Sequence, residues 1–563
     1  MCNYRARRIK CDEGRPTCRR CLTSKRACVY VDTPPPAKAS QYALLLPKPA
    51  RLLQCILPSM PAGLGQPCAM NIEFFRLHTV DQLPGSELEF PWRNILFPDG
   101  SCEPVISHAI AALGSMHRAQ GNSLPGLSPG SDYGAEPYEL YNKSVVALRK
   151  YIDRAPELGV AVASETTLIA IMLLFCFEVL SGNDHYASKH LIAAFTILSK
   201  NSGQHTNDTS APGTLVLGSS NAPRTDALVH LFLRLASDWI VSGPFYYGGC
   251  ESPLQAICKD PMPGQFQSVK DASLHLDVLC SDASRHEEHL FDKADHVLNF
   301  DKNDTTSHQC EQFCLVMATS RTLGFDDQSA FQLNFHATIA ALVRWRAAFA
   351  ALLSSQPWSN SVLLLEAQYL QTWIFLQIIN DFDQTICDGL EEDFRRVIDI
   401  AEAYMLQEPS SIGSAGSEHC SLWSLSNLGN NLASTICLVI EKCRDSKIRR
   451  RGIEILKAFD LRGIFDTPYL VAYYQHVVAE EEMRAREMQP TMLLDLKCSD
   501  VPPQARFVDV LMCFCDSEQE GDEFYRKDFG SMMYAVNSGH SGVLETGQSN
   551  FFVFRDGSSV AMA

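Results

Sequence analysis

Apolar residues recur at helical spacing from about residue 70 onward, and clusters of Gly, Ser, Pro and Asn interrupt the pattern. Side chains three and four positions apart share one face of a helix, so the pattern predicts a large, mostly all-α domain. The expected helices are about 104–119, 138–154, 165–180, 185–199, 226–242, 328–354, 360–380, 394–407, 421–442 and 466–486. The polar, glycine-containing stretch 200–224 is expected to form a surface excursion.

Both ends of the chain depart from this pattern. Segments 31–50 and 57–67 are rich in proline, which has no backbone N–H and cannot propagate a helix, so they predict a linker. Beyond residue 503 the helical spacing fades, and the apolar run Phe551 to Phe554 predicts a short strand. The expected parts are an N-terminal module over 1–30, the linker over 31–67, a helical domain over 68–503 and a C-terminal extension over 504–563.

The longest apolar run, Leu168 to Phe177, is far shorter than the roughly 18 residues that a membrane span requires. It predicts a core helix, and no membrane partner is expected. The first residues are basic and lack an apolar segment after them, which argues against a secretory signal. The chain has 21 cysteines, and the sixteen that follow residue 28 are therefore expected to be buried thiols rather than disulfides.

Charge is distributed unevenly along the chain. The first 28 residues hold nine Lys and Arg against Asp12 and Glu13, a local net charge of +7, whereas the whole chain carries −17. The remaining residues therefore carry −24 and would repel phosphate. Any contact with nucleic acid is expected to come from the first thirty residues.

The same segment contains four cysteines at regular spacing. Six residues separate Cys11 from Cys18, two separate Cys18 from Cys21, and six separate Cys21 from Cys28. A thiolate pair two residues apart can reach one zinc ion from a tight turn, and the six-residue arms can return the other thiolates to the same place. The spacing predicts a zinc site.

With its basic run Arg5, Arg7, Arg8 and Lys10, and with Pro16 before Cys18, the segment resembles the fungal Zn(II)2Cys6 binuclear zinc cluster. The resemblance implies that Cys11 belongs to the first zinc, that Cys21 and Cys28 belong to the second, and that Cys18 bridges both. The two further cysteines of the family pattern fall on Met1 and Tyr4. Cys2 lies one position from the first expected ligand and would substitute only after a local rearrangement.

Three explanations of this difference stay open. In the first, the natural chain begins upstream or has an exon boundary near residue 4. In the second, the four remaining cysteines hold a single zinc ion, and in the third the module has lost its metal and its fold.

The resemblance also implies how the module contacts DNA. Arg7 and Arg8 occupy the positions at which the family reads a CGG triplet in the major groove, where an arginine fork donates two hydrogen bonds to guanine. Phosphate contacts, which set affinity rather than sequence preference, are expected from Arg15, Arg19, Arg20, Lys25 and Arg26. The principal candidates for DNA binding are Arg5, Arg7, Arg8, Lys10, Arg15, Arg19 and Arg20.

Three stretches of the helical region, 107–118, 141–152 and 168–198, resemble the fungus-specific regulatory domain that follows many zinc clusters. The resemblance implies a nuclear, sequence-specific regulator of RNA polymerase II transcription that controls metabolic or secondary-metabolite genes. Its partners would be CGG-containing double-stranded DNA, a second copy or a relative in a dimer, and a small-molecule effector. The alternative is a DNA-binding-defective helical interaction protein derived from such a factor.

Other chemistry is sparse in the sequence. His308, Cys310 and Cys314 are a further metal candidate, because positions 310 and 314 share a helical face. We find no glycine-rich phosphate loop, nucleophile elbow or paired-histidine zinc helix, so no enzymatic activity is expected.

Overall fold

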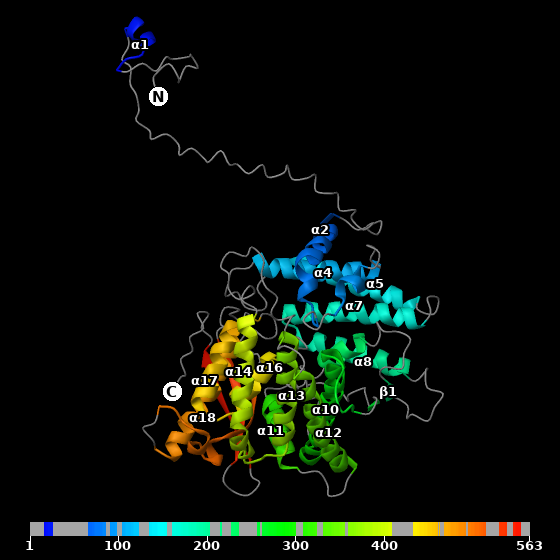
Figure 1. Ribbon diagram of the computed structural model, residues 1–563, viewed down its shortest axis with the longest axis vertical. Coiled ribbons are helices and arrows are strands. Elements are labelled where there is room, and N and C mark those ends of the chain that lie inside the picture. Colours follow the sequence, from blue (N-terminus) through cyan, green and yellow to red (C-terminus); the bar gives the residue numbers. More distant parts are fainter. Residues whose placement is uncertain are drawn as a thin grey trace. The chain divides into compact units, whose positions relative to one another are not determined.

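The computed structural model describes residues 16–25, 66–85, 90–97, 104–122, 134–154, 160–202, 214–216, 227–235, 256–258, 262–299, 308–323, 330–354, 359–407, 432–459, 461, 467–490, 494–513, 529–537 and 544–552. The chain divides into two units, Met1–Ser59 and Met60–Ala563. In the first unit the described residues contain one short helix, α1 (Arg19–Thr23). All further elements belong to the second unit (Figure 1).

The second unit begins with a group of helices that we call the N-terminal helical layer. Its members are α2 (Gln66–Phe74), α3 (Trp92–Leu96), α4 (Pro104–Asn122), α5 (Ala135–Asp153), α7 (Val160–Ser181), α8 (Asp184–Ser202) and a helix over 227–235. In Figure 1 the blue and cyan ribbons of α4, α7 and α8 run across the view, one below the other. Their side chains form one continuous apolar core.

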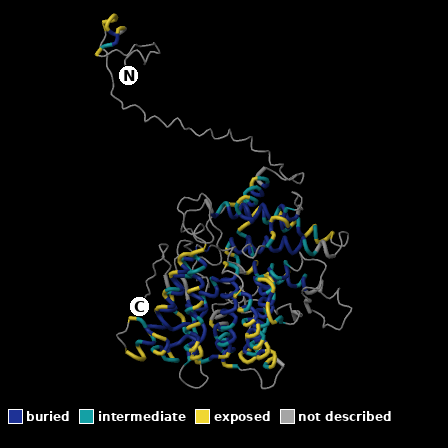
Figure 2. The backbone as a smooth tube through the Cα atoms, in the orientation of Figure 1, coloured by how far each residue is buried: buried dark blue, intermediate teal, exposed yellow. Residues whose placement is uncertain are grey.

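Helix α7 occupies the centre of this layer. Every residue from Thr166 to Leu180 is buried, and Figure 2 shows this ribbon almost entirely in the buried colour. A helix covered on all sides needs no polar face, which explains the unbroken apolar run over 168–177. By length and composition alone, Ser164–Ser181 and Phe331–Leu353 could each cross a membrane, and 83% and 33% of these windows are buried inside the protein. The prediction of a core helix at Leu168 to Phe177 is confirmed.

The following helices form a second core, which we call the C-terminal helical group. They are α10 (Val269–Leu298), α11 (His308–Thr322), α12 (Ala330–Leu353), α13 (Asn360–Ile378), α14 (Glu391–Gln407), α16 (Leu432–Lys442), α17 (Ser446–Ala458) and α18 (Thr467–Met488). Helix α13 lies inside the group and is buried along most of its length. Trp345 of α12 stacks on Phe349 and on Tyr369 of α13, with ring centroids 4.6 and 5.5 Å apart.

The expected mostly helical fold class is confirmed, and eight of the ten expected helices agree closely with the observed bounds. The other two are described in part, as residues 227–235 and as Leu432–Lys442. The sequence did not predict α10, although its 30 residues make it longer than the other helices described here. The reason is that its buried face carries polar side chains, including His275, Asp277 and Glu287, which mask the apolar periodicity.

Strands lie in two places in the described part of the chain. Thr214–Val216 (β1) and Ala256–Cys258 (β2) form a parallel pair. Phe507–Cys513 (β3), Phe529–Asn537 (β4) and Leu544–Phe552 (β5) form an antiparallel sheet in the order β3-β4-β5. The expected strand at Phe551 to Phe554 overlaps the end of β5 as far as residue 552, and residues 553–554 lie outside the described part.

Strand β3 of the three-stranded sheet is covered on both faces. Its Phe507 and Val510 join the main core of the C-terminal helical group, whereas Val508 and Leu511 belong to a separate cluster with Phe291 of α10 and residues of α11. A strand buried on both faces is apolar without alternation, as the sequence FVDVLMC of β3 is. Strand β3 therefore lies between two sets of helices in the second unit.

One exception to this apolar pattern is Asp509 in β3, which belongs to a set of buried charges. We call the set the buried charge network, and its members are Glu287, Arg321, Lys442, Arg444, Arg449, Glu481 and Asp509. Arg321 donates to Asp509 and to Glu287, at 3.1 Å in each case. Lys442 donates to the Val508 carbonyl at 2.9 Å. These bonds fix β3 against α10, α11 and α16.

Glu481 of α18 is the centre of the other half of the network. Its Oε1 accepts hydrogen bonds from Arg444 at 3.1 Å and from the Phe507 backbone N–H at 2.9 Å. Its Oε2 lies 2.6 Å from Nη1 of Arg449. Nearby arginines hold the pKa of the Glu481 carboxyl below its usual range despite burial, so the group stays ionised. One carboxylate thus joins α17, α18 and the start of β3.

The backbones of α2 and α4 approach each other closely at Gly114, and this contact gives the first prediction. A Cβ at Gly114 would lie 2.4 Å from the Asn71 carbonyl oxygen, so a side chain there must push the two helices apart. Gly114→Ala should destabilise the full-length chain by about 1–3 kcal/mol. Urea denaturation followed by circular dichroism measures this, with Gly389→Ala as the control because its Cβ would meet nothing within 4 Å. Equal stability of the two variants would contradict the packing.

The buried charge network gives a second prediction. Glu481→Gln keeps the shape of the side chain but leaves the Arg444 and Arg449 charges without their shared counter-ion. Removing one partner of a buried ion pair costs about 3–5 kcal/mol, and a loss of this size in urea denaturation is expected. The control is Glu480→Gln, at the adjacent, less buried position of α18, which should change stability by no more than about 0.5 kcal/mol.

Candidate metal centre and DNA-binding module

The described part of the first unit is a turn that carries two cysteines. Cys18 precedes α1 and Cys21 lies within it, and both side chains are buried. The next residue of the helix, Leu22, is 70% exposed. The backbone N–H of Cys21 donates to the Cys18 sulfur at 3.4 Å. The turn thus places two buried cysteines three positions apart at the start of a very short helix.

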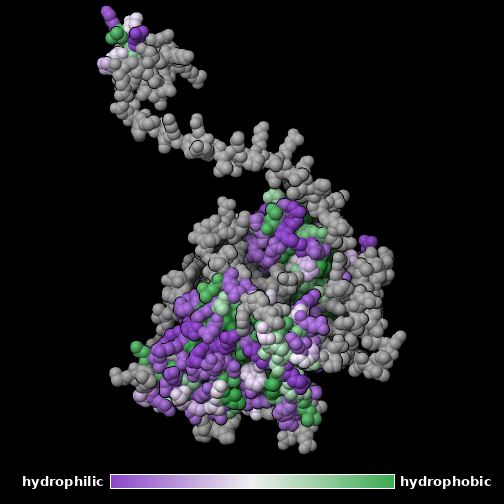
Figure 3. Space-filling view, in the orientation of Figure 1, coloured by the Kyte–Doolittle hydropathy of each residue, from purple (hydrophilic) through white to green (hydrophobic). Residues whose placement is uncertain are grey.

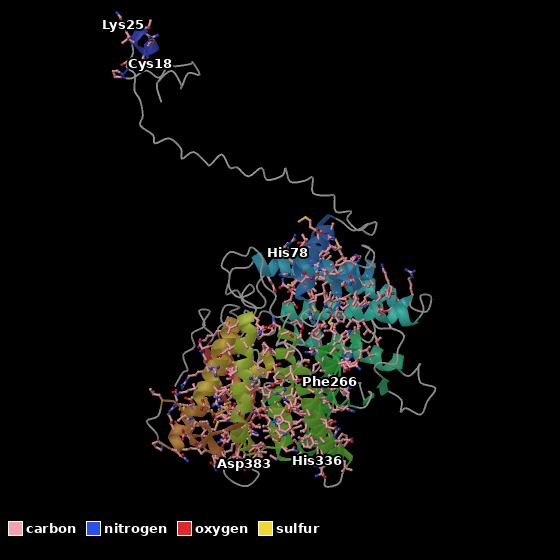
Figure 4. All side chains as sticks on the ribbon, viewed as in Figure 1. Cys18, Lys25, His78, Phe266, His336 and Asp383 are labelled. Atoms are coloured by element: carbon pink, nitrogen blue, oxygen red, sulfur yellow. The ribbon has the colours of Figure 1, made fainter. Side chains whose placement is uncertain are left out.

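Local hydrogen bonds hold the rest of this turn. Leu22 N–H donates to the Cys18 carbonyl at 3.0 Å, and Thr23 Oγ1 donates to the Arg19 carbonyl at 2.8 Å. Lys25 has φ of 49°, a left-handed conformation that ends a helix. Figure 4 labels Cys18 and Lys25 at the two ends of this dark blue segment.

Two features of the turn suit a zinc ion: it carries two thiol ligands, and its helix is too short to be stable alone. A helix of five residues cannot be stable through its own backbone hydrogen bonds, so α1 needs a further source of folding energy. Thiolate–zinc bonds supply such energy in small metal modules. The N–H···S bond at Cys18 is of the kind that orients a metal-binding thiolate. Cys18 and Cys21 are therefore suited to hold zinc.

The described residues contain only part of the predicted site. Cys18, Cys21 and Arg19 are described with their side chains, Arg19 is exposed, and Arg20 is described in its backbone as part of α1. The remaining candidates lie outside the described residues: Cys2, Arg5, Arg7, Arg8, Lys10, Cys11, Arg15 and Cys28. The full ligand set and the base-reading arginines thus stay predictions.

The second metal candidate of the sequence is described only in part. His308, Cys310 and Cys314 all lie on α11, but the side chains of His308 and Cys310 lie outside the described part of the chain. Cys314 is fully buried in an apolar cluster with Phe291 and Val316. The described side chains include no group of three or more His, Cys, Asp or Glu that could hold a metal ion. Cys314 thus serves in packing. The expectation of buried free thiols is confirmed for Cys68, Cys176, Cys280, Cys314, Cys387, Cys443 and Cys498, and Cys437 is partly buried.

Two family models match the chain. Residues 2–37 match the fungal Zn(2)-Cys(6) binuclear cluster domain, and residues 73–235 match the fungal specific transcription factor domain. The second match coincides with most of the N-terminal helical layer. The chain thus contains one segment that matches a fungal zinc-cluster domain and one that matches a fungal transcription factor domain, and zinc is the metal that the cluster domain binds.

A curated relative adds a more particular likeness. The chain is 26% identical over 241 residues to the aspercryptin biosynthesis cluster-specific transcription regulator of Emericella nidulans. The alignment covers 38% of this chain and 36% of the relative, so the chain spans about a third of the length of the curated relative that it matches. No solved structure matches the chain.

The fit of Cys18 and Cys21 to zinc gives a third prediction. Cys21→Ser should lower the zinc affinity of the purified full-length chain by on the order of tenfold or more, because a hydroxyl is a poorer zinc ligand than a thiolate. Zinc content by mass spectrometry and competition with a chromogenic chelator measure the change. Cys68→Ser, which alters a buried thiol in α2, is the matched control and should leave zinc content unchanged. Undiminished zinc in Cys21→Ser would remove Cys21 from the ligand set.

Proposed function

We propose that this chain is a nuclear regulator of RNA polymerase II transcription that binds CGG-containing double-stranded DNA through its N-terminal module. The observation that carries the proposal is the buried Cys18–Cys21 turn on a helix with an exposed arginine, inside the segment that matches the zinc-cluster family. A zinc-held helix gives basic side chains a rigid frame on the DNA backbone. The strongly acidic remainder of the chain leaves this module as the part that attracts phosphate.

The target genes that we propose are those of a secondary-metabolite pathway. The support is the curated relative, whose name describes it as a regulator specific to the aspercryptin biosynthesis cluster. Because the identity is 26%, the proposal concerns the class of target and not the product.

The helical unit is proposed to regulate the module, with a regulatory domain that runs from residue 68 to residue 503. This extent goes beyond the matched range, which ends at 235. Its support is a buried junction between the two helical groups. Arg234 in the matched range donates to Ser273 of α10 at 2.7 Å and lies 3.5 Å from Asp277, which accepts from Gln368 of α13 at 2.9 Å. Bonds of this kind would transmit a change in either group to the other.

An effector and a dimer partner complete the proposal. An open surface hollow of about 770 Å³ between α14 and α17 is lined by the apolar side chains of Met405 and Ile455 and by the charged side chains of Arg450 and Glu402. It lies on the face that Figure 3 shows as largely hydrophilic over α14 and α17. A lining of apolar and charged side chains suits a small amphipathic molecule. A second copy or a relative is proposed as the dimer partner, and sedimentation of the purified chain tests it.

The competing function is a DNA-binding-defective interaction protein. The observation that favours it is the presence of Met1 and Tyr4 where the family pattern has cysteines. The two functions differ in one measurement, because only the first requires the full-length chain to bind a CGG-containing duplex more tightly than a duplex in which CGG is scrambled.

This measurement gives a fourth prediction. Arg8→Ala should reduce the preference for CGG by about 1–3 kcal/mol, since a bidentate contact to guanine is lost. Arg19→Ala should weaken binding to both duplexes equally and lower the slope of log K against log salt by about one, as expected for a phosphate contact. Fluorescence anisotropy at several salt concentrations measures both effects. A zinc-loaded chain without any preference for CGG would favour the competing function.

A further inference from the structure

Two buried cysteines that are distant in sequence have their thiols in contact. Cys443 directly follows α16, and Cys498 opens a short 3-10 turn (Cys498–Asp500) after α18. A hydrogen bond joins their side chains, and the two residues are 0% and 5% exposed. The backbone around them is joined as well, because Ser446 N–H donates to the Leu496 carbonyl at 2.9 Å and Leu496 N–H donates to Ser446 Oγ at 3.0 Å.

A third constraint holds the Cys498 turn in place. Nη2 of Arg506 donates to the Cys498 carbonyl at 2.9 Å, and Nε of Arg506 donates to the Val501 carbonyl at 2.8 Å. The same guanidinium is fixed by Asp388 through two bonds of 2.9 Å. The two segments that carry the cysteines are therefore fixed by hydrogen bonds on both sides.

The charges around the two thiols differ in sign. Arg444 is adjacent to Cys443, and Arg449, which shares the Glu481 carboxylate with Arg444, favours a thiolate on Cys443. The carboxylates of Asp388 and Glu391 oppose a thiolate on Cys498. The hydrogen bond from Cys443, together with the backbone N–H of Arg444, lowers the pKa of Cys498 to about 7. The same contact and burial raise the pKa of Cys443, so the pair consists of one thiolate and one thiol.

We propose that Cys443 and Cys498 form a reversible dithiol–disulfide site that hydroperoxides oxidise. The thiolate of Cys498 attacks the O–O bond of hydrogen peroxide, which gives a sulfenic acid on Cys498 and, with one proton, a molecule of water. The sulfur of Cys443 then attacks the sulfenic sulfur, the S–S bond forms, and a second water leaves with the proton of the Cys443 thiol. Two thiols are oxidised by two electrons in total and one peroxide is reduced to two waters.

Other buried cysteines of the described part lack this combination. Burial raises the pKa of Cys176, and burial raises the pKa of Cys280 to about 12. Cys280 shares a hydrogen bond with the hydroxyl of Thr372 rather than with a second thiol. A protonated thiol is a poor nucleophile toward peroxide, so these residues should stay reduced while the Cys443–Cys498 pair reacts.

The disulfide would close a loop that contains α17 and α18. These helices supply Arg449 and Glu481 to the buried charge network, so the bond would restrain the same part of the structure that the network joins. A cross-link of this length removes conformational freedom mainly from the unfolded chain. The oxidised protein is therefore expected to unfold at higher urea concentration than the reduced protein.

The test uses the purified, zinc-loaded full-length chain and hydrogen peroxide. After oxidation the remaining thiols are alkylated, the chain is cleaved at glutamates, and disulfide-linked peptides are identified by mass spectrometry. We expect a linked pair containing Cys443 and Cys498 that disappears on treatment with dithiothreitol. Its rate of formation should rise about tenfold between pH 6 and pH 8, because the thiolate fraction of Cys498 increases over this range.

Two variants and a control separate the steps. In Cys443→Ser the second thiol is absent, so the sulfenic acid on Cys498 should accumulate and be trapped by dimedone. In Cys437→Ser, which alters a partly buried thiol on the same helix α16, the disulfide should form as in the unaltered chain. The wild-type measurement needs no variant to fold. The proposal is overturned if Cys498 is oxidised only to sulfinic acid, if the linked pair involves another cysteine, or if both thiols survive at peroxide concentrations that oxidise Cys437.

Discussion

The arrangement of the C-terminal helical group depends on one buried carboxylate, that of Glu481. This group accepts hydrogen bonds from Arg444 and from the Phe507 backbone and lies within ion-pair distance of Arg449. Burying a charge is costly, and the cost is offset only when opposite charges and hydrogen-bond donors surround it. The three elements that supply these partners must therefore lie in one defined arrangement. Apolar packing has no preferred direction and would allow several relative positions of α17, α18 and β3. The hydrogen bonds and ion pair of the Glu481 carboxylate select one of them.

The same constraint connects the distant parts of the second unit. Around strand β3, Arg321 and Lys442 extend the network toward α10, α11 and α16. On the other side, Arg444 connects the network to the Cys443–Cys498 pair, because its backbone N–H donates to Cys498. One set of buried charges thus fixes the position of β3 and adjoins the two thiols. A chemical change at the thiols would act on the helices that carry the network.

The N-terminal module depends on a different constraint. Its described helix has five residues, and neither a hydrophobic core nor backbone hydrogen bonds can stabilise so short an element. Metal binding has to supply that energy, so the identity and number of thiolates decide whether the module folds. The helical unit, by contrast, has its own large apolar cores, which stabilise it by burial of side chains. Loss of zinc should therefore affect the module without unfolding the helices.

Local sequence determined much of this protein. The spacing of Cys18 and Cys21 and the basic residues around them indicated a zinc module, because thiolate geometry is set over a few residues. The periodicity of apolar residues located α4, α7, α13 and α18, because an amphipathic or fully buried helix is recorded in its own sequence. Tertiary structure alone decided the rest. Helix α10 and strand β3 carry polar residues on buried faces, and their partners lie on elements far away in the chain. The contact between Cys443 and Cys498 could not be predicted either, because it arises only when α16 and the turn after α18 are brought together by packing.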